Sequence, residues 1–456
     1  MMAAGAAERE AGAVADESAG ATRWYVCPAR DQLFLLPVSM RDWLDEGHLA
    51  WFVVDVVDEL DTAALHRRAG GCPGRRPYEP EMMCTLLLYA YCCGIRSSRR
   101  IEAACRTDAA FRVICGGLVP DHATIARFRC EHERALMGLF GQVLAMCRRA
   151  GLVKVGVVAV DSTKLGASAS SLQNRSYEQI VEEILAEAAA VDAREDELYG
   201  EARGDELPEE LADPRSRRAR LKAIKRELDA EREAEQRARQ ELLERREEHR
   251  RRTGRNPMGR PPKQEPSDPP AGRVNVTDPD SRPVRTPRGF IQGYNAHAAV
   301  AEGQIIVAAE VTAGSGDQGH LEPVVNQARE QLDHVGAGAP EVVLADAGYW
   351  ASGQVKALQQ EGITILVPPD KNVKSPGRRS RGPGSEQMRE RLRTEAGARL
   401  YAQRIKIEPV FGQTKHNRRI DRFHRRGLPA VRAEWNLITT THNLLKLWVA
   451  AKPAIA

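Results

Sequence analysis

The 456-residue sequence predicts a mixed α/β protein that begins with a region of helices. Three observations predict this fold class. Apolar residues recur at helical spacing over 43–150, short Val-rich runs typical of buried strands occur at 154–160 and 341–345, and a highly charged helical segment at 177–252 separates them. Hydrophobic residues make up 42% of the chain, which is enough to build a core in two or three domains.

The first 150 residues divide into a tail and a helical region. Residues 1–22 are rich in Ala, Gly and Glu and lack the basic start and apolar centre of a signal peptide. We expect them to form a disordered tail. Residues 23–150 are expected to form an N-terminal helical domain that binds DNA.

Two helices expected at 97–114 and 122–132 have the arrangement of a helix-turn-helix. A turn that contains glycines and a proline joins them, and the second helix would display Arg127 and Arg129 to DNA. Helix pairs joined by such turns are also common packing units. Both DNA contact and simple packing therefore remain open for this pair.

Two polar segments follow the first expected strand. Residues 176–252 predict an inserted charged helical hairpin, because only a thin apolar seam that includes Leu221 and Leu228 runs through the segment. A charged spacer is the alternative. Residues 253–289 are rich in Pro, Arg and Gly, which is typical of a linker.

The remaining residues, 151–175 and 290–450, are expected to form one mixed α/β domain. Asp317 precedes an expected helix and is interpreted as its N-cap. The expected order after the first strand is a β-hairpin (290–300 and 305–312), a helix (317–332), a strand (342–346), a helix (354–360), a strand (363–367) and a long helix.

The charge distribution indicates a polyanionic partner. The net charge is only +4, but residues 371–426 contain 17 Lys and Arg against 5 Asp and Glu, a net charge of +12. The nine cysteines include no C-x-x-C pair, so zinc is not expected, and a reducing intracellular compartment fits them best. No apolar run reaches the ~20 residues that a membrane span needs.

Three acidic residues are candidates for a metal site. Asp161 and Asp346 each follow a Val-rich strand, and Glu408 lies in a basic segment near the C-terminus. An Asp at such a position alone is more often a helix cap. Three carboxylates together suit Mg²⁺, which binds through a few carboxylates and leaves other positions to water and phosphate oxygens.

The segment around Glu408 adds groups suited to phosphate. On a continuous helix, Tyr401, Arg404, Glu408 and Lys415 would fall within a sector about 60° wide. A solvated charged face is the plainer interpretation of this segment alone. Pro409 disfavours helical geometry at the residue before it, so the helix is expected to kink or start anew there.

The order Asp161, Asp346, Glu408 and the spacing Y-x2-R-x3-E-x6-K resemble a DDE transposase of bacterial insertion sequences. Further segments that carry the resemblance are YEPEMMCTLLLYAYCCGIRSSRRIE from Tyr78, PDHATIARFR from Pro120, VDSTKLGASAS from Val160, GYNAHAAV from Gly293, ADAGYW from Ala345 and THNLLKLW from Thr441. The resemblance implies an RNase H-like mixed sheet flanked by helices. The charged hairpin would be inserted after its first strand.

The resemblance also implies an activity and roles for residues. Asp161, Asp346 and Glu408 would hold two Mg²⁺ ions, with Mn²⁺ able to substitute, and would catalyse cleavage and strand transfer of double-stranded DNA at the ends of a mobile element. Arg404 and Lys415 would bind phosphates. Tyr401 would bind DNA or pack the helix on the sheet.

Other implications concern Lys164, assembly and location. Lys164 would contact DNA or balance the acids. The protein would act as a homodimer that bridges two DNA ends, in the cytoplasm with the nucleoid. Two alternatives stay open: a catalytically silent, domesticated DNA-binding relative, and a nuclease of the same fold.

Overall fold

The computed structural model describes residues 39–66, 77–171, 174–176, 239–254, 273–275, 277–287, 289–314, 316–370, 384–406 and 408–452, with residues 233 and 237. The chain divides into two units, 1–43 and 44–456, and the described part of the first contains the 3₁₀ turn η1 (Met40–Trp43). The predicted tail lies outside the described residues, as do most of the predicted hairpin and about half of the linker. The described end of the hairpin, 239–253, is helical and largely exposed.

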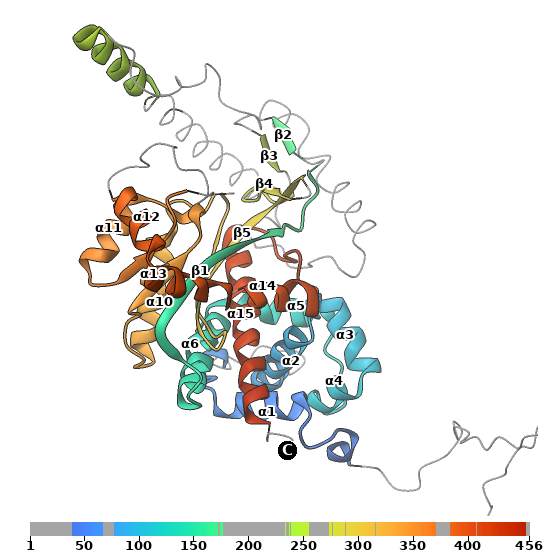
Figure 1. Ribbon diagram of the computed structural model, residues 1–456. Helices are drawn as coiled ribbons and strands as arrows, with labels where there is room; N and C mark the ends of the chain where they lie inside the picture. The colour runs from blue at the N-terminus through green and yellow to red at the C-terminus, as the bar shows by residue number, and fades with distance from the viewer. Residues whose placement is uncertain are drawn as a thin grey trace, which may run out of the picture. The chain divides into compact units, whose positions relative to one another are not determined.

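The N-terminal region is helical, as predicted (Figure 1). The helix expected at 97–114 is interrupted at Asp108, whose extended backbone ends one helix and whose carboxylate caps the next by accepting from the amides of Ala110 and Phe111. The elements are α1 (Leu49–Glu59), η2 (Ala63–Leu65), α2 (Pro80–Cys92), α3 (Ser98–Thr107), α4 (Ala109–Ile114), α5 (His122–Glu131) and α6 (Glu133–Arg149).

A mixed sheet forms the centre of the second unit. Its strands run in the order β4-β5-β1-β7-β8, and β6 also pairs with β5. The β1–β5, β4–β5 and β5–β6 pairs are antiparallel, whereas β1–β7 and β7–β8 are parallel. The strands are β1 (Lys154–Gly166), β4 (Arg282–Thr286), β5 (Gly289–Glu302), β6 (Ile306–Thr312), β7 (Val342–Ala345) and β8 (Thr364–Leu366), and β2 (Asn174–Ser176) pairs with β3 (Arg273–Asn275) separately.

The predicted β-hairpin is confirmed by β5 and β6. Their register joins Val300 to Ile306 across a tight turn. Gly303 and Gln304 adopt φ of 75° and 65° in this turn, the left-handed region that hairpin turns require.

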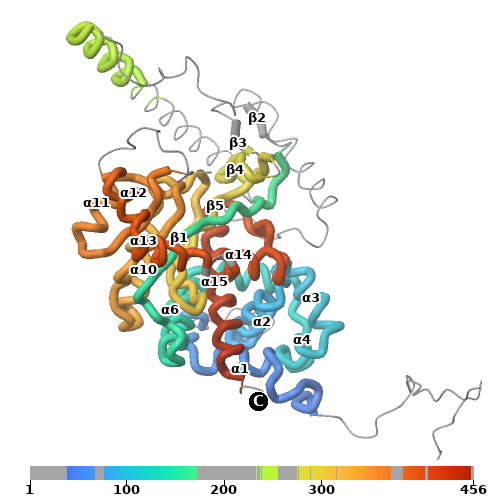
Figure 2. The backbone as a smooth tube through the Cα atoms, in the orientation of Figure 1, coloured from blue at the N-terminus to red at the C-terminus, as the bar shows by residue number. Residues whose placement is uncertain are grey.

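The first strand is longer than the sequence predicted. It was expected to end at Asp161, but β1 continues to Gly166 because β5 pairs with it that far. The courses of β1 and β5 can be followed in Figure 2. Pairing with β7 stops earlier, at Val160 and Ala345. Asp161 therefore lies within β1, at the point where the strand loses its neighbour on one side.

Helices flank the sheet and include α10 (Leu321–His334), α11 (Ser352–Gln360), α12 (Ser385–Arg393), α13 (Glu395–Ala402) and α15 (Leu428–Ala451). The interpretation of Asp317 as a helix N-cap is wrong. The cap residue of α10 is His320, which makes no side-chain cap hydrogen bond. The Asp317 carboxylate binds other side chains, described below.

The segment 401–415 is not one helix. After α13 the chain forms a 3₁₀ turn, η6 (Gln403–Lys406), a new helix, α14 (Glu408–Gly412), and a π-helical turn, η7 (Gln413–Asn417). Pro409 lies in the first turn of α14, where a missing N–H costs nothing. The prediction that the helix starts anew near Glu408 is confirmed, and the angular sector computed for a continuous helix does not apply.

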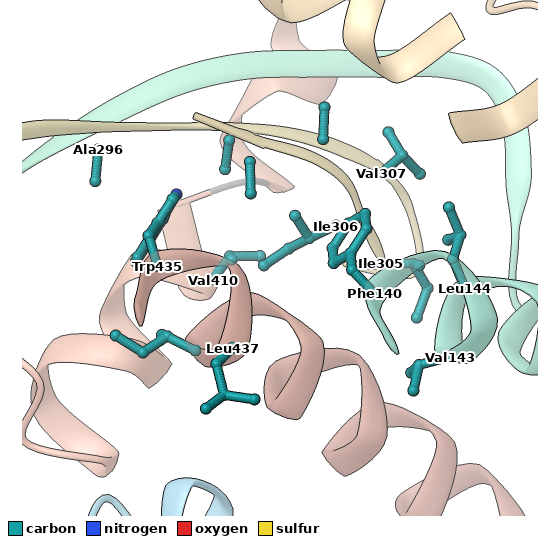
Figure 3. Close-up of a cluster of buried hydrophobic side chains, with 14 of the residues drawn as sticks. Phe140, Val143, Leu144, Ala296, Ile305, Ile306, Val307, Val410, Trp435 and Leu437 are labelled. Carbon is teal, nitrogen blue, oxygen red and sulfur yellow. The ribbon is translucent and has the colours of Figure 1, made fainter. Parts of the chain in front are cut away.

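Helix α15 joins the N-terminal helices and the sheet into one core. Figure 3 shows Trp435 and Leu437 of α15 beside Phe140 and Leu144 of α6 and Ile306 of β6, all of them buried. Fully burying one such side chain contributes about 1.5–3 kcal/mol. Among the described helices, none combines the length and apolarity needed to cross a bilayer.

Part of the predicted basic block is interior rather than surface. Arg418, Arg425 and Arg426 are almost completely buried. Arg418 donates to the Tyr91 carbonyl of α2 at 2.7 Å, and Arg425 pairs with Glu133 of α6 at 2.7 Å. These charges hold elements together and do not face a polyanion, so the DNA-facing charge of this block is smaller than its composition predicts.

Candidate functional site

Two of the three predicted acids lie side by side at the centre of the sheet. Because Val160 and Ala345 are partners across the parallel β1–β7 pair, the residues that follow them, Asp161 and Asp346, lie next to each other where the pairing ends. The charge of Asp346 acts on Asp161, which agrees with this proximity. The sheet itself therefore brings these two carboxylates together.

The Asp346 carboxylate is held by the turn that follows β7. Its Oδ1 accepts a hydrogen bond from the Gly348 amide at 2.8 Å and so caps the 3₁₀ turn η5 (Ala347–Tyr349). A Cβ at position 348 would stand 2.9 Å from Oδ1 of Asp346 and 2.9 Å from Oδ2 of Asp317. Glycine is needed here because two carboxylates flank the place of a side chain.

Arg404 and Tyr401 approach the acids from the C-terminal segment. Arg404 Nη1 donates to Asp161 Oδ2 at 3.0 Å, and Tyr401 donates from its hydroxyl to the Ala345 carbonyl at 3.3 Å. The guanidinium also lies 6.0 Å from the centre of the Tyr401 ring, within range of a cation–π contact. Both residues therefore contact the ends of the strands that carry Asp161 and Asp346.

Lys415 and Glu408 complete the predicted motif. Lys415 donates from Nζ to the backbone carbonyl of Lys164 at 2.8 Å, so it lies against the same stretch of β1. Burial lowers its pKa. Glu408 is the first residue of α14, between Arg404 and Lys415 in the chain, and its side chain lies outside the described part of the structure.

The ionisation of Asp161 is disfavoured. Its pKa is raised from 3.8 to about 6, mainly by burial and also by the charges of Asp346 and Asp317. The Ser162 amide and Arg404 act in the opposite direction. A cation that binds here would relieve a real electrostatic cost.

A fourth acid lies behind this pair. Asp317 Oδ1 accepts from Ser162 Oγ at 2.6 Å, from Asn295 Nδ2 at 2.7 Å and from Lys164 Nζ at 3.1 Å. The Lys164 ammonium also binds the Asn295 side-chain oxygen at 2.6 Å. We call these four residues the Asp317 cluster. Its hydrogen bonds lower the pKa of Asp317 against the effect of burial.

The cluster and Asp161 occupy opposite faces of the sheet. Paired residues of β1 and β5 lie on the same face of the sheet, and successive residues alternate between faces. Ser162 and Lys164 pair with His297 and Asn295 on one face. Asp161 pairs with Ala298, which lies on the other face together with Ala296. Figure 3 shows Ala296 on the side of Trp435 and α15. Asp161 thus lies on the same face of the sheet as Ala296, and the side chains of Ser162, Lys164 and Asn295 lie on the opposite face.

Sequence interpretation missed Asp317, Ser162 and Asn295. For Ser162 and Asn295 the signal was polar residues at alternate positions of strands that are otherwise apolar, where alternation places them on one face. Asp317 lies outside the strands and carried no such signal. His297 belongs to the same row, is fully buried and bonds the Tyr349 hydroxyl at 2.7 Å. Burial lowers its pKa to about 3, so it stays neutral and acts as a hydrogen-bond partner.

Three predicted DNA contacts have different outcomes. Arg129 is only 2% exposed and donates to the Tyr91 hydroxyl and the Arg96 carbonyl, so its assignment to DNA is corrected to a structural role. Lys164 is held within the Asp317 cluster. Of its two predicted roles, this supports neutralising the charge of the acids rather than contacting DNA. Arg127 is exposed on α5 and keeps its predicted role as a proposal.

The carboxylates of Asp161 and Asp346 are candidate ligands of a divalent metal ion. Asp161 and Asp346 offer adjacent, partly exposed oxygen ligands of the kind that Mg²⁺ prefers. Among the described side chains, no group of three acids, histidines or cysteines could hold a metal, and Glu408 is not among them. The two aspartates fit a shared ion that takes a third ligand from elsewhere.

Comparison with protein families identifies two segments. Residues 38–131 match the model of a transposase domain, and residues 272–444 match the model of a transposase DDE domain. The second range includes Asp346, Arg404, Glu408 and Lys415, whereas Asp161 lies between the two ranges. Searches of curated proteins and of solved structures gave no significant match.

Proposed function

Because the chain is a DDE transposase, we propose that Asp161, Asp346 and Glu408 form its catalytic site for DNA strand cleavage and strand transfer at the ends of a mobile element. The main observation behind this proposal is that Asp161 and Asp346 are adjacent at the point where β7 ends and β1 continues. DDE transposases use divalent metals and bind DNA. Glu408 enters by resemblance to the family motif.

An RNase H-like fold is part of the proposal. Three antiparallel strands in the spatial order β6-β5-β1, continued by parallel β7 and β8, support it. In such a sheet the first acid lies on the central strand and the second at the end of its parallel neighbour, as Asp161 and Asp346 do.

We propose that the three carboxylates hold two Mg²⁺ ions, for which Mn²⁺ can substitute. Bound there, such ions would activate a water or a 3′-hydroxyl and stabilise the leaving oxygen. Arg404, now paired with Asp161, would turn its planar guanidinium to a DNA phosphate. Tyr401 would keep η6 against the strand end through the Ala345 carbonyl.

The DNA complex is proposed to be a homodimer that bridges two element ends, and the protein to act at the nucleoid in the cytoplasm. Arg127 on α5, Arg404 and Lys415 are the proposed contacts to double-stranded DNA. Phosphate contacts of this kind make affinity fall steeply with salt.

Site variants test the proposal. We expect Asp161→Asn, Asp346→Asn and Glu408→Gln each to lower cleavage of DNA carrying the element ends by ~10³-fold or more, because each removes a ligand of the charge-stabilising site. Asp333→Asn, an exposed change on α10, is the matched control and should cleave normally. Circular dichroism checks that every variant is folded.

The two alternatives give different results with pre-cut ends, Mg²⁺ and a target plasmid. Strand joining supports the transposase. Hydrolysis without joining would point to a nuclease of the same fold, and binding without either reaction would point to a silent relative. A wild-type protein no more active than Asp161→Asn would overturn the catalytic assignment.

A further inference from the structure

We propose that Asp317 is a positioning residue of the transposase site: it holds the Lys164 ammonium behind the catalytic aspartates and so keeps that cation off Asp346. This inference rests on the proposed metal site. It assigns a task to a carboxylate that lies outside the D-D-E set.

Lys164 lies close to the proposed metal site. Lys164 lies in β1 beyond the last residue paired with β7, so no neighbouring strand separates its side chain from the turn after β7. Its Nζ lies 3.1 Å from Oδ1 of Asp317. The other oxygen of Asp317 and Oδ1 of Asp346 both lie 2.9 Å from one point, the place of a Cβ at Gly348. The carboxylate that Lys164 binds and the carboxylate of Asp346 therefore flank the same point.

The second step is the strength with which the ammonium is held. Lys164 Nζ has three acceptors in the cluster: Asn295 Oδ1 at 2.6 Å, Asp317 Oδ1 at 3.1 Å and Ser162 Oγ at 3.3 Å. Its side chain is 19% exposed and that of Asp317 is 18% exposed, so water screens the pair weakly. Asp317 is the one anion among the three acceptors.

The third step is the consequence of losing that anion. A partly buried ammonium without a counter-charge moves to the nearest carboxylate. We expect that carboxylate to be Asp346, which flanks the same point as Asp317, and a lysine paired with Asp346 would compete with a metal ion for the same oxygen atoms. Asp317 thus acts on the metal site through Lys164, and its own oxygens need not be ligands.

A double-mutant comparison tests this role. Mn²⁺ is titrated into the full-length protein without DNA, and free Mn²⁺ is measured by electron paramagnetic resonance. We expect Asp317→Asn to weaken Mn²⁺ binding about tenfold, the lower end of the range for residues that orient metal ligands. Adding Lys164→Met to Asp317→Asn should restore binding to within about twofold of Lys164→Met alone, because the competing cation is gone.

Two controls separate this role from general loosening of the cluster. Ser162→Ala removes a neutral donor to Asp317 and the longest of the three contacts of Lys164, but it leaves the Asp317–Lys164 ion pair, so its Mn²⁺ affinity should stay within about twofold of the wild type. Thermal unfolding monitored by circular dichroism shows whether each variant is folded. If Asp317→Asn does not fold, the double mutant with Lys164→Met and the single mutant Ser162→Ala still distinguish the two explanations. A purely structural loss in the cluster would weaken Mn²⁺ binding in each of these two variants.

Each result decides the inference. Unchanged Mn²⁺ affinity in Asp317→Asn would overturn it, and so would an affinity that stays tenfold low in the double mutant, which would mark Asp317 as a ligand or a structural residue. Asp161→Asn in the same titration distinguishes failure of the proposed function. If wild-type protein binds Mn²⁺ no more tightly than Asp161→Asn, the metal site itself is wrong, and the role of Asp317 is overturned with it.

Discussion

Asp161, a proposed catalytic residue, is partly buried at a cost to stability. Its side chain is 20% exposed and lies beside a second carboxylate, so the ionised form is poorly solvated. Burial raises its pKa to about 6, which means that the folded protein binds this proton more tightly than the unfolded chain does. The folded state is therefore favoured at low pH by this group, and the contribution is lost as pH rises through 6.

The pH dependence expected from the raised pKa of Asp161 can be tested by substitution. In a buffer with EDTA, Asp161→Asn should increase the free energy of unfolding by about 1–3 kcal/mol at pH 8, because an uncharged amide replaces a carboxylate whose ionisation is disfavoured. The gain should shrink as the pH falls towards 4, where the wild-type carboxyl is protonated in the folded state. Urea denaturation of both proteins at pH 8 and pH 5 measures the difference.

The exposed Asp333→Asn is the control for this measurement and should behave alike at both pH values. An Asp161→Asn protein that is less stable than the wild type at pH 8 would contradict the argument. It would mean that the ion pair with Arg404 outweighs the burial of the charge.

Single residues also mark the limit of prediction from sequence. Asp161 and Asp346 could be proposed because each follows a Val-rich run, and such apolar runs can be recognised in a sequence. Asp317 looked like a helix cap, since the sequence carries no sign that Ser162, Lys164 and Asn295 converge on it. That convergence depends on the register between β1 and β5, which is a tertiary property.

At the scale of elements, the C-terminal segment is held by buried charges. Glu434 of α15 accepts from Arg96 Nη1 at 2.6 Å and from the backbone amides of His424 and Arg425. The side chains of Glu434 and Arg96 are 0% and 3% exposed, so neither charge is solvated by water. This single carboxylate ties α15 to the chain between α2 and α3 and to the loop before α15.

Glu434→Ala should therefore destabilise the protein strongly. Removing one partner of a buried ion pair leaves the other charge without compensation and typically costs 3–5 kcal/mol, so we expect a loss of about that size in urea denaturation. Arg399→Ala removes an ion pair with Glu395 whose side chains are 78% and 90% exposed, and it should cause no measurable loss. Equal effects of the two changes would contradict this account.

Elements differ in how well sequence pattern predicts them. The hairpin of β5 and β6, with its turn at Gly303, is confirmed because alternation and turn residues are local signals. The angular sector over 401–415 assumed one helix, but α13 already ends at Ala402. The sequence indicated a break near Pro409 but not the succession of 3₁₀, α and π turns. The length of β1 was underestimated because its last residues are strand only through their pairing with β5.

At the scale of the whole molecule, the N-terminal helices and the sheet are coupled through α15. Cys92 of α2 and Cys147 of α6 both donate weakly to backbone carbonyls of α15, at Thr441 and Asn443. The Asn443 side chain in turn bonds both backbone groups of Ile306 in β6. One helix near the C-terminus thus covers elements that lie far apart in the sequence, and residues 44–150 of the predicted helical domain share their core with it.

The coupling predicts how a fragment would behave. Residues 39–150 expressed alone should not unfold cooperatively, because α2 and α6 would expose to water the apolar faces that α15 covers in the whole chain, and each such side chain forfeits about 1.5–3 kcal/mol of burial. Circular dichroism during urea titration measures this. Co-expression with residues 151–456 supplies α15 in trans and should restore one cooperative transition, since the missing surface is then buried again. A fragment that unfolds cooperatively by itself, with the helix content of the intact protein, would show that this region is an independent domain, and movement between it and the sheet would then be available to position DNA at Asp161.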